Sequence, residues 1–375
     1  MTSLFCLQLA LGTIMTPQEQ TSVISTAQSC LNEAPVTIVA FPAKGSAGGV
    51  HDYYSEGDYW WPDPAGTNLP YQKHDGLTNP ENFVAHRETV MRFSVTVSTL
   101  VAGYKLTGDQ TFARQAFRHL NAWFVDPDTR MTPSLLYAQA IKGRVTGRGI
   151  GIIDTIHLIE VAQSIRVLIR SGAITNAETE PILAWFRQYL DWMTRHEYGK
   201  QEREALNNHG TWWVAQAAAF ASLVGDAAVL DSCRERFRNF LLPRQLQPDG
   251  SFPLELERTK PFGYSLFNLE GMAVVCRLLT RPGDDLWAYT LPDGRTIRAA
   301  FNFLSPFVRD KSRWPHPKDV KYFDLLPVRQ MAWLFAADAF NDAGYMALWK
   351  RLDPRQGEGE IARTFPIRQP SLWFE

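Results

Sequence analysis

Residues 104–124, YKLTGDQTFARQAFRHLNAWF, carry the clearest structural pattern in the chain. Apolar residues recur at helical spacing on both sides of Gly108-Asp109, which is the pattern of two helices joined by a tight turn. Residues 221–241, ASLVGDAAVLDSCRERFRNFL, repeat this layout around a second Gly-Asp pair, and the apolar positions of the two stretches coincide. RPGDDLWAY, at residues 281–289, repeats the Gly-Asp pattern less closely. The sequence therefore predicts recurring helical hairpins.

Further helical patterns occupy much of the chain after residue 86. They cover residues 154–172, 176–196, 263–280, 296–308 and 327–352. Recurring hairpins build either an open solenoid or a closed ring of paired helices. Irregular spacing and long intervening loops favour the ring. We therefore predict an all-α fold, an α/α toroid forming an incomplete barrel of helical hairpins. It is expected to be a single domain over residues 1–375, with a loop-rich segment at 1–82 across or beside its mouth.

Composition narrows the class of protein. The chain has 375 residues, of which 45% are hydrophobic and 21% charged, as in a globular protein with a sizeable core. The formal net charge is −1, so no overall field favours nucleic acid or an anionic membrane as a partner. No stretch is long and apolar enough to span a bilayer. An anionic ligand would have to be met by a local basic cluster.

Cysteine and histidine give no metal or disulfide signature. The four cysteines are Cys6, Cys30, Cys233 and Cys276, with no C-x-x-C pair among them. The eight histidines form neither H-x-x-H nor H-E-x-x-H, and we expect no catalytic metal. Residues 1–16 are apolar without a preceding Lys or Arg, so they are either a poor or truncated signal peptide or an N-terminal helix.

Four stretches are polar, aromatic and glycine-rich where an ordinary helix would not be. They are HDYYSEGDYWWPDP (51–64), YAQAIKGRVTGRGIGIIDTIH (137–157), NNHGTWW (207–213) and ELERTKPFGYSLFNLEG (255–271). Each has an ordinary structural explanation when taken alone. Asn207 or Asn208 could cap the helix that follows, and Arg258 could pair with nearby glutamates. The basic residues near 142–148 could be a solvated turn or could bind carboxylates.

Together and in this order, the four stretches resemble the alginate-lyase superfamily of polysaccharide lyases. The resemblance covers about residues 49–340 and includes SEGDYWWPDP, DGLTNPENFVAHR, LLYAQAIKGRVTGRGIGIIDTIHL, NNHGTWW and RTKPFGYSLFNL. It implies an α/α toroid that cleaves uronic-acid polymers by β-elimination and leaves 4,5-unsaturated uronate ends. It also implies that no cofactor is needed, that the partner is an anionic uronan, and that the protein is periplasmic or secreted.

The resemblance also assigns the catalytic residues. The family's Asn-His pair corresponds to Asn208 and His209, its base-and-acid tyrosine to Tyr264, and its arginine to Arg258. β-Elimination removes the proton on C5, which is acidic enough only when the neighbouring carboxylate is neutralised. Asn208, His209 and Arg258 are expected to provide that neutralisation. Tyr264 would work as a phenolate, and neighbouring positive charge would lower its pKa from the ordinary value of about 10.

Stereochemistry narrows the substrate. Mannuronate and glucuronate share their configuration at C4 and C5, so one phenol on one face of the sugar can serve as base and then as acid. Guluronate is inverted at C5 and needs base and acid on opposite faces, with His209 as a candidate base. The predicted substrate is therefore polymannuronate or a glucuronan.

Other residues of the four stretches are expected to form the cleft. Aromatic rings that could stack on sugars are Tyr59, Trp60 and Trp61, and polar groups that could hold neighbouring uronates are Gln139, Lys142, Arg144 and Arg148. A structural role is expected for His51, His74 and His86. Two alternatives remain: a toroid glycoside hydrolase with carboxylates drawn from Glu56, Asp58 and Asp63, and a non-catalytic polysaccharide-binding protein.

Overall fold

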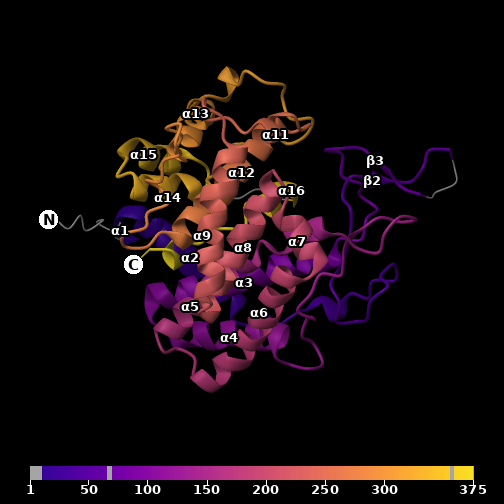
Figure 1. Cartoon of the computed structure of the whole chain (residues 1–375). Coiled ribbons are helices and arrows are strands. Elements are labelled where there is room, and N and C mark those ends of the chain that lie inside the picture. The colour runs from indigo at the N-terminus through magenta and orange to yellow at the C-terminus, as the bar shows by residue number, and fades with distance from the viewer. Residues whose placement is uncertain (1–10, 66–69, 355–358, 375) are drawn as a thin grey trace.

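The computed structural model describes residues 11–65, 70–354 and 359–374. Helices dominate it, and they form a ring of paired helices with an inner and an outer layer (Figure 1). The inner helices are α3 (Ala85–Thr107), α5 (Leu158–Arg170), α8 (Asn208–Val224), α12 (Pro261–Leu279) and α14 (Met331–Ala339). Each packs against the next in this order. The predicted all-α toroid is confirmed.

The outer helices follow the inner ones along the chain. They are α4 (Gln110–Phe124), α6 (Asn176–Arg195), α9 (Ala227–Arg236), α13 (Arg298–Arg309) and α15 (Ala343–Arg351). α4 packs on α3, α9 on α8, α13 on α12 and α15 on α14, whereas α6 contacts α4 and α8.

The sequence explains which helices lie inside. α8 is buried along nearly its whole length because WWVAQAAAFA presents apolar or small residues on every side. α4 instead buries one stripe, formed by Phe112, Ala116, Leu120 and Trp123, and exposes its charged residues. A helix apolar all round belongs between other helices, whereas a one-sided stripe suits the outer layer.

The two hairpin turns predicted from the Gly-Asp pairs are confirmed. Gly108 and Gly225 end their helices in the left-handed conformation, with φ of 75° and 77°, where a side chain would be strained. Asp109 and Asp226 then cap the next helix by accepting a backbone N–H. The third repeat of the pattern, at residues 281–289, does not form a helical hairpin, so this prediction is wrong. α12 ends at Leu279, and a β-bridge between Arg281 and Asp284 closes the turn.

Several short helices and turns connect or flank these helices. The short helices are α1 (Leu11–Ile14), α7 (Glu197–Arg203), α10 (Leu242–Gln245), α11 (Pro253–Leu256) and α16 (Gly359–Thr364). A π-helical turn, Phe237–Leu241, joins α9 to α10. Short 3-10 helices lie at Ile38–Ala40, Gly149–Thr155, Lys311–Arg313, Phe323–Leu325 and Pro370–Leu372. None of the helices within the described residues is long and apolar enough to cross a membrane.

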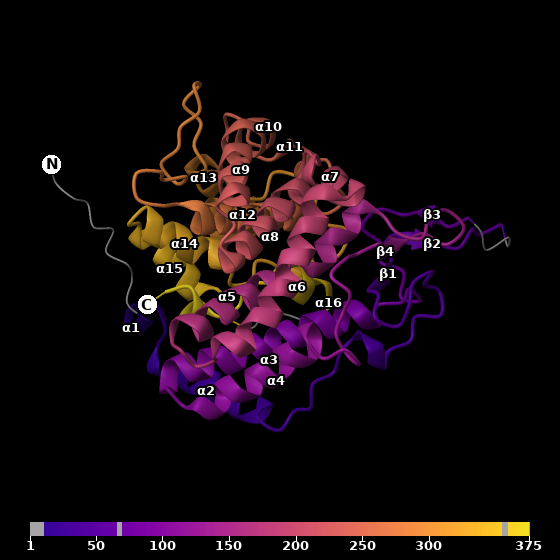
Figure 2. The same cartoon turned by 60° about the horizontal axis from the view of Figure 1, so that its bottom comes forward.

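Two small strand pairs lie beside the ring. β1 (Tyr54–Glu56) pairs in parallel with β4 (Tyr137–Ala140), and β2 (Trp60–Trp61) pairs in antiparallel fashion with β3 (Gln72–Lys73). The β2–β3 hairpin projects from the side of the molecule opposite α1 (Figures 1 and 2). The position of residues 1–82 across or beside the mouth of the toroid stays a prediction.

The predicted loop-rich segment at residues 1–82 contains a regular helix that the sequence did not indicate, α2 (Pro17–Cys30), which packs on α3. Its apolar pattern is weak, but its start carries a capping box: the side chain of Thr16 accepts the Glu19 N–H, and Glu19 accepts the Thr16 N–H. Residues 1–10, including Cys6 and most of the predicted signal-like segment, lie outside the described residues. Three cysteines, Cys30, Cys233 and Cys276, are buried free thiols.

One buried acid within the ring makes its stability depend on pH. Glu270 of α12 accepts the N–H of Ala332 at the start of α14, at 2.8 Å. Burial raises the pKa of Glu270 to about 8. In the unfolded chain, the Glu270 carboxyl group loses its proton near pH 4.5. Between this pH and about pH 8, the folded state binds one proton more than the unfolded state, so the folded state loses stability as the pH rises. We expect Glu270→Gln to flatten the dependence of the urea midpoint on pH between about 5 and 8. An unchanged slope would contradict this.

Candidate active site

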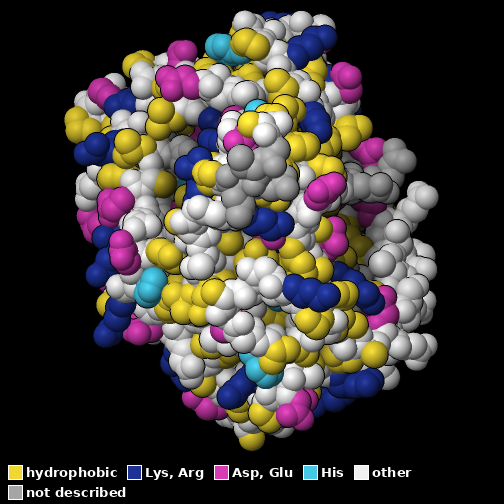
Figure 3. Space-filling view, turned by 90° about the vertical axis from the view of Figure 1, so that its right-hand side faces the viewer, with side chains coloured by type: hydrophobic (Ala, Val, Ile, Leu, Met, Phe, Trp, Pro, Cys, Tyr) yellow, Lys and Arg dark blue, Asp and Glu magenta, His cyan; other side chains and the backbone are white. Residues whose placement is uncertain are grey.

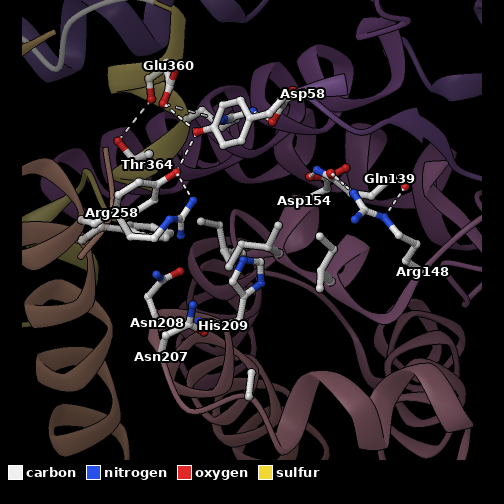
Figure 4. A pocket seen from close by; sticks show the side chains of 18 of the residues that line it. Asp58, Gln139, Arg148, Asp154, Asn207, Asn208, His209, Arg258, Glu360 and Thr364 are labelled. Carbon is white, nitrogen blue, oxygen red and sulfur yellow. Dashed lines mark hydrogen bonds and ion pairs between the residues drawn. The ribbon is translucent and has the colours of Figure 1, made fainter. Parts of the chain in front are cut away.

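A cavity of about 570 Å³ lies where α8 and α12 begin. Its walls come from residues 58–60, from the loop before α5, from the first turns of α8 and α12, and from α16. In Figure 4, Asn208, His209, Arg258, Thr364, Gln139 and Arg148 surround one open space. Figure 3 views the molecule from the β2–β3 side, where Lys and Arg side chains are scattered over the face among Asp and Glu side chains. Segments far apart in sequence therefore share one hollow.

Tyr264 lies in the first turn of α12. Pro261 opens this helix, and Asp319 caps it by accepting the N–H groups of Phe262 and Gly263, both at 2.9 Å. The phenol oxygen of Tyr264 accepts a hydrogen bond from Arg258 at 3.0 Å and lies 2.7 Å from the hydroxyl of Tyr59. The phenol is thus held by groups on two separate segments.

Arg258 has different partners from those expected. Its guanidinium binds Asp75 through two nitrogens, at 3.0 and 3.3 Å, and also donates to Tyr264. Asp75 keeps this partner across the ordinary pH range, because the hydrogen bonds and charge of Arg258 outweigh burial and lower the pKa of Asp75 to about 2. Arg258 lines the cavity, and its contacts in the ligand-free protein are with the phenol and with Asp75. Its predicted role in neutralising a uronate carboxylate stays a prediction.

The NNHG motif contains both a cap and cavity-lining groups. Asn207 is the N-cap of α8, and its side chain accepts the His209 N–H at 3.3 Å. Asn208 is 1% exposed, and both its backbone N–H and its side-chain amide donate to Glu255, at 2.6 and 2.7 Å. Gly210 allows this compact start, because a Cβ there would lie 2.2 Å from the carbonyl oxygen of Ala205. Both predicted roles of the motif fit this geometry.

His209 lies against a second buried glutamate. Its Nδ1 is 2.6 Å from Oε1 of Glu202, which belongs to α7. Burial favours the neutral imidazole, but the charge and hydrogen bond of Glu202 outweigh it and raise the pKa of His209 above its ordinary value of 6.5. His209 and Tyr264 line the same cavity, as a shared catalytic site requires.

The cavity walls carry charges of both signs. The basic residues are Lys73, Arg148, Arg258 and Arg363, and the acidic residues are Asp58, Asp154 and Glu360. Two of the acids are already paired, Asp58 with Arg87 and Arg363, and Glu360 with Lys260. An anionic ligand in the cavity would meet the arginine side chains of these walls.

The pKa of Tyr264 departs from the sequence-based expectation. Burial raises the pKa of this phenol to about 12, although the Arg258 guanidinium acts in the opposite direction. The expected lowering by neighbouring positive charge is therefore wrong for the ligand-free protein. Burial destabilises the phenolate more than one neighbouring guanidinium stabilises it.

Four of the predicted cleft residues line the cavity: Tyr59, Trp60, Gln139 and Arg148. The side-chain amide of Gln139 donates to Asp154 at 3.0 Å, and Arg148 donates to the Gln139 carbonyl at 2.7 Å. The guanidinium carbon of Arg148 lies 5.8 Å from the centroid of the Trp60 ring. Arg148 is thus held between a carbonyl and an aromatic ring at the cavity wall.

Three predicted cleft residues do not line the cavity. Lys142 pairs with Glu56 at 3.1 Å. Arg144 donates to the carbonyl of Tyr71 at 2.8 Å, and Trp61 donates to the carbonyl of Leu77 at 2.9 Å. All three residues lie in the polar stretches described above, but contacts with local partners hold them outside the cavity.

The three unassigned histidines make structural contacts. His51 is 2.8 Å from the carbonyl of Arg130, and His74 packs edge-on against Trp61. His86 accepts the N–H of Tyr54 at 3.0 Å, with its other ring nitrogen 2.8 Å from the carbonyl of Phe41. None of the three lines the cavity.

The carboxylates proposed for a hydrolase are poorly placed for acid catalysis. Asp58 is bound by Arg87 and Arg363, whose charges outweigh burial and lower its pKa to about 2. It therefore holds no proton to donate near neutral pH. Glu56 and Asp63 are not among the residues that line the cavity. Within the described ranges, no three His, Cys, Asp or Glu side chains gather as ligands for a metal ion.

Several groups at the site were not predicted. Glu202 and Glu255 lie behind His209 and Asn208, and α16 brings Glu360 and Arg363 to the cavity wall. Glu360 forms an ion pair with Lys260, which in turn donates to the Tyr59 hydroxyl at 3.0 Å. Glu255 opens the fourth polar stretch, 255–271, whereas Glu202 and Glu360 lie outside all four stretches. The acidic residues just before NNHGTWW are the sequence signal that could have indicated Glu202.

Comparisons with known proteins agree with one another. The family model described as alginate lyase matches residues 39–314. An alginate lyase from Bacteroides ovatus is 32% identical, with a TM-score of 0.81 and alignment over 90% of this chain and 91% of that chain. Alginate lyase A1-III from Sphingomonas species A1 is 15% identical, with a TM-score of 0.54 over 95% of both chains. A complex of A1-III with a tetrasaccharide has a TM-score of 0.59 at 14% identity, over 95% of this chain and 94% of that chain. No curated protein matches the sequence.

Proposed function

Because the chain belongs to the alginate lyase family and is a polysaccharide lyase acting on an alginate-type polymer, we propose that it cleaves polymannuronate by syn β-elimination. The observation that carries this proposal is the position of the Tyr264 phenol. It accepts a hydrogen bond from Arg258 at 3.0 Å and shares one cavity with Asn208 and His209. A phenol beside a cation, facing amide and imidazole donors, suits the removal of a proton next to a carboxylate.

The reaction divides into two proton transfers. Asn208 and His209 bind the uronate carboxylate and stabilise the charge that develops on it. The Tyr264 phenolate takes the C5 proton, the C4–C5 double bond forms, and the bond from C4 to the glycosidic oxygen breaks. The protonated Tyr264 then returns its proton to the leaving oxygen. Base and acid are the same atom, so both transfers occur on one face of the sugar.

Arg258 has a different part in this proposal. It is tied to Asp75 and points to the phenol, so it stabilises the phenolate rather than the substrate carboxylate. Tyr59 lies 2.7 Å from the same oxygen and can donate a second hydrogen bond to the phenolate. These two donors offset part of the cost of ionising a buried tyrosine.

The pKa values of Tyr264 and His209 predict a broad pH profile. The reactive form, phenolate with imidazolium, holds as many protons as the form with phenol and neutral imidazole. Its share therefore rises up to the His209 pKa, above 6.5, and then stays constant until the Tyr264 pKa of about 12. We expect kcat/KM on polymannuronate to have this acidic limb and then to remain level up to about pH 10. A fall beginning near about pH 8 would contradict the assignment.

The substrate is tested by the ultraviolet absorbance of unsaturated products. Purified protein is incubated separately with polymannuronate, polyguluronate and a glucuronan. We expect product from polymannuronate, and from glucuronan if contacts to the C2 hydroxyl permit. Product from polyguluronate alone would overturn the syn mechanism, because the C5 hydrogen of guluronate lies on the other face.

We also propose that the chain acts as one domain. α16 lies beyond the matched residues 39–314, yet Glu360 and Arg363 line the same cavity as Tyr59 and Tyr264. A separate unit would not need to share its side chains with the site in this way.

A further inference from the structure

Glu202 is a buried carboxylate that lies behind the catalytic imidazole rather than in the cavity. It is 1% exposed, and its Oε1 lies 2.6 Å from Nδ1 of His209. Within the part of the chain that the structure describes, its Oε2 has no hydrogen-bond partner. A buried carboxylate with one oxygen unpaired is costly unless a neighbouring positive charge compensates it. The imidazole in direct contact is the group that can supply that charge.

This contact fixes the arrangement of protons on His209. A carboxylate only accepts, so Nδ1 must donate. Nε2 is then the nitrogen left for the cavity that His209 lines. When the ring is protonated, Nε2 is a hydrogen-bond donor. When the ring is neutral, Nε2 carries a lone pair and can act as a base. The protonation state of this ring therefore determines which chemistry it offers to a sugar.

The charges that face His209 come from several elements. Glu202 from α7 and Glu255 from α11 favour the imidazolium, whereas Arg258 disfavours it. Arg148, in the segment before α5, interacts with Glu202 from a greater distance. Burial opposes the charged ring, and the pKa of His209 is nevertheless raised. Glu202 is the acid in direct contact, and its removal would leave burial and Arg258 opposed only by the more distant Glu255.

We propose that Glu202 is a positioning residue that holds His209 as an imidazolium and so restricts the site to syn elimination. This inference rests on the proposed function. An imidazolium can donate to a uronate carboxylate but cannot accept the C5 proton, so Tyr264 is the sole base. Guluronate presents its C5 hydrogen to the opposite face and would need a neutral His209. Glu202 would thus determine which epimer at C5 is cleaved, without touching the substrate.

The test is Glu202→Gln, which keeps the size of the side chain and an acceptor for Nδ1–H but removes the charge. The His209 titration is followed by NMR of the imidazole nitrogens, assigned by its loss in His209→Gln. We expect the His209 pKa to fall by about one unit or more. The plateau of kcat/KM on polymannuronate should fall about tenfold for each unit, and its acidic limb should move to lower pH. The ratio of polymannuronate to polyguluronate cleavage should decrease.

Two variants control for a merely structural effect. Glu197→Gln removes an exposed charge from the same helix and should change neither the titration nor the rates. Glu202→Asp keeps the charge and should restore most of the His209 pKa. An equal His209 pKa in wild type and Glu202→Gln would overturn the proposal. If Glu202→Gln does not fold, the wild-type titration decides: a His209 pKa at or below 6.5 overturns it, and a higher one supports it.

Failure of the proposed function would look different. Wild-type protein would then release no unsaturated product from polymannuronate or glucuronan, whatever the His209 titration. Conversely, normal polymannuronate cleavage combined with a wild-type His209 pKa at or below 6.5 would reject the role of Glu202 and leave the proposed function standing.

Discussion

Replacing Tyr264 by phenylalanine is expected to lower kcat on polymannuronate by about 10⁴-fold, at the upper end of what one acid–base group contributes. The loss should be this large because one oxygen is both the base that takes the C5 proton and the acid that releases the product. The ring of Tyr264 packs on the hydrophobic core, and phenylalanine preserves that packing. The measurement is the initial rate of ultraviolet absorbance, with oligomannuronate binding followed by calorimetry.

Tyr345→Phe is the matched control for Tyr264→Phe. Its hydroxyl donates to Asn302 at 2.8 Å on the outer layer, so this variant also loses one phenolic hydrogen bond but none at the cavity. We expect near wild-type turnover from it. Binding of oligomannuronate should survive in Tyr264→Phe, because Asn208 and His209 still face the carboxylate. Turnover within about tenfold of wild type in Tyr264→Phe would remove Tyr264 from the chemistry.

The second large effect is expected from Asn208→Ala. Loss of one preorganised donor to a developing oxyanion typically lowers kcat by about 10² to 10³-fold. Asn208 also donates twice to the buried Glu255, and the alanine variant keeps only the backbone bond. Leaving a buried acceptor short of a partner costs about 1–3 kcal/mol, so the variant should also unfold at lower urea concentration. Rates must therefore be expressed per folded molecule.

Asn239→Ala provides the comparison for Asn208→Ala. Asn239 is exposed and bonds only to the surface residue Glu235, so the same substitution there should alter neither rate nor stability appreciably. If Asn208→Ala retained kcat within about threefold of wild type while KM rose, Asn208 would bind the substrate and the transition state equally. That result would reject its assigned role in stabilising the transition state.

The helical hairpins could be predicted because their signals are local. Gly108-Asp109 and the corresponding pair at 225–226 combine a left-handed helix end with a cap for the next helix, and both act within a few residues. α2 was missed because its polar sequence hides the apolar face it packs on α3. The turn at 281–289 has the same Gly-Asp signal but no helix directly after it.

The candidate site was only partly predictable for a related reason. Asn208, His209 and Tyr264 lie in distinctive motifs, and the fold brings them to one cavity. Glu202 and Glu255 are ordinary acids in sequence, and only the packing of α7 and α11 against the start of α8 makes them partners of the imidazole and the amide. The raised pKa of Tyr264 depends on burial, which a sequence motif does not record.

The arginines in the cavity walls also bear on ionic strength. With a formal net charge of −1, the chain has almost no long-range field for dissolved salt to screen. The guanidinium groups of Arg148, Arg258 and Arg363 act at contact distance inside a cavity, where screening by mobile ions is weak. Added salt should therefore change the first encounter with a polyanionic chain only slightly, and the attraction felt by the bound sugar should persist.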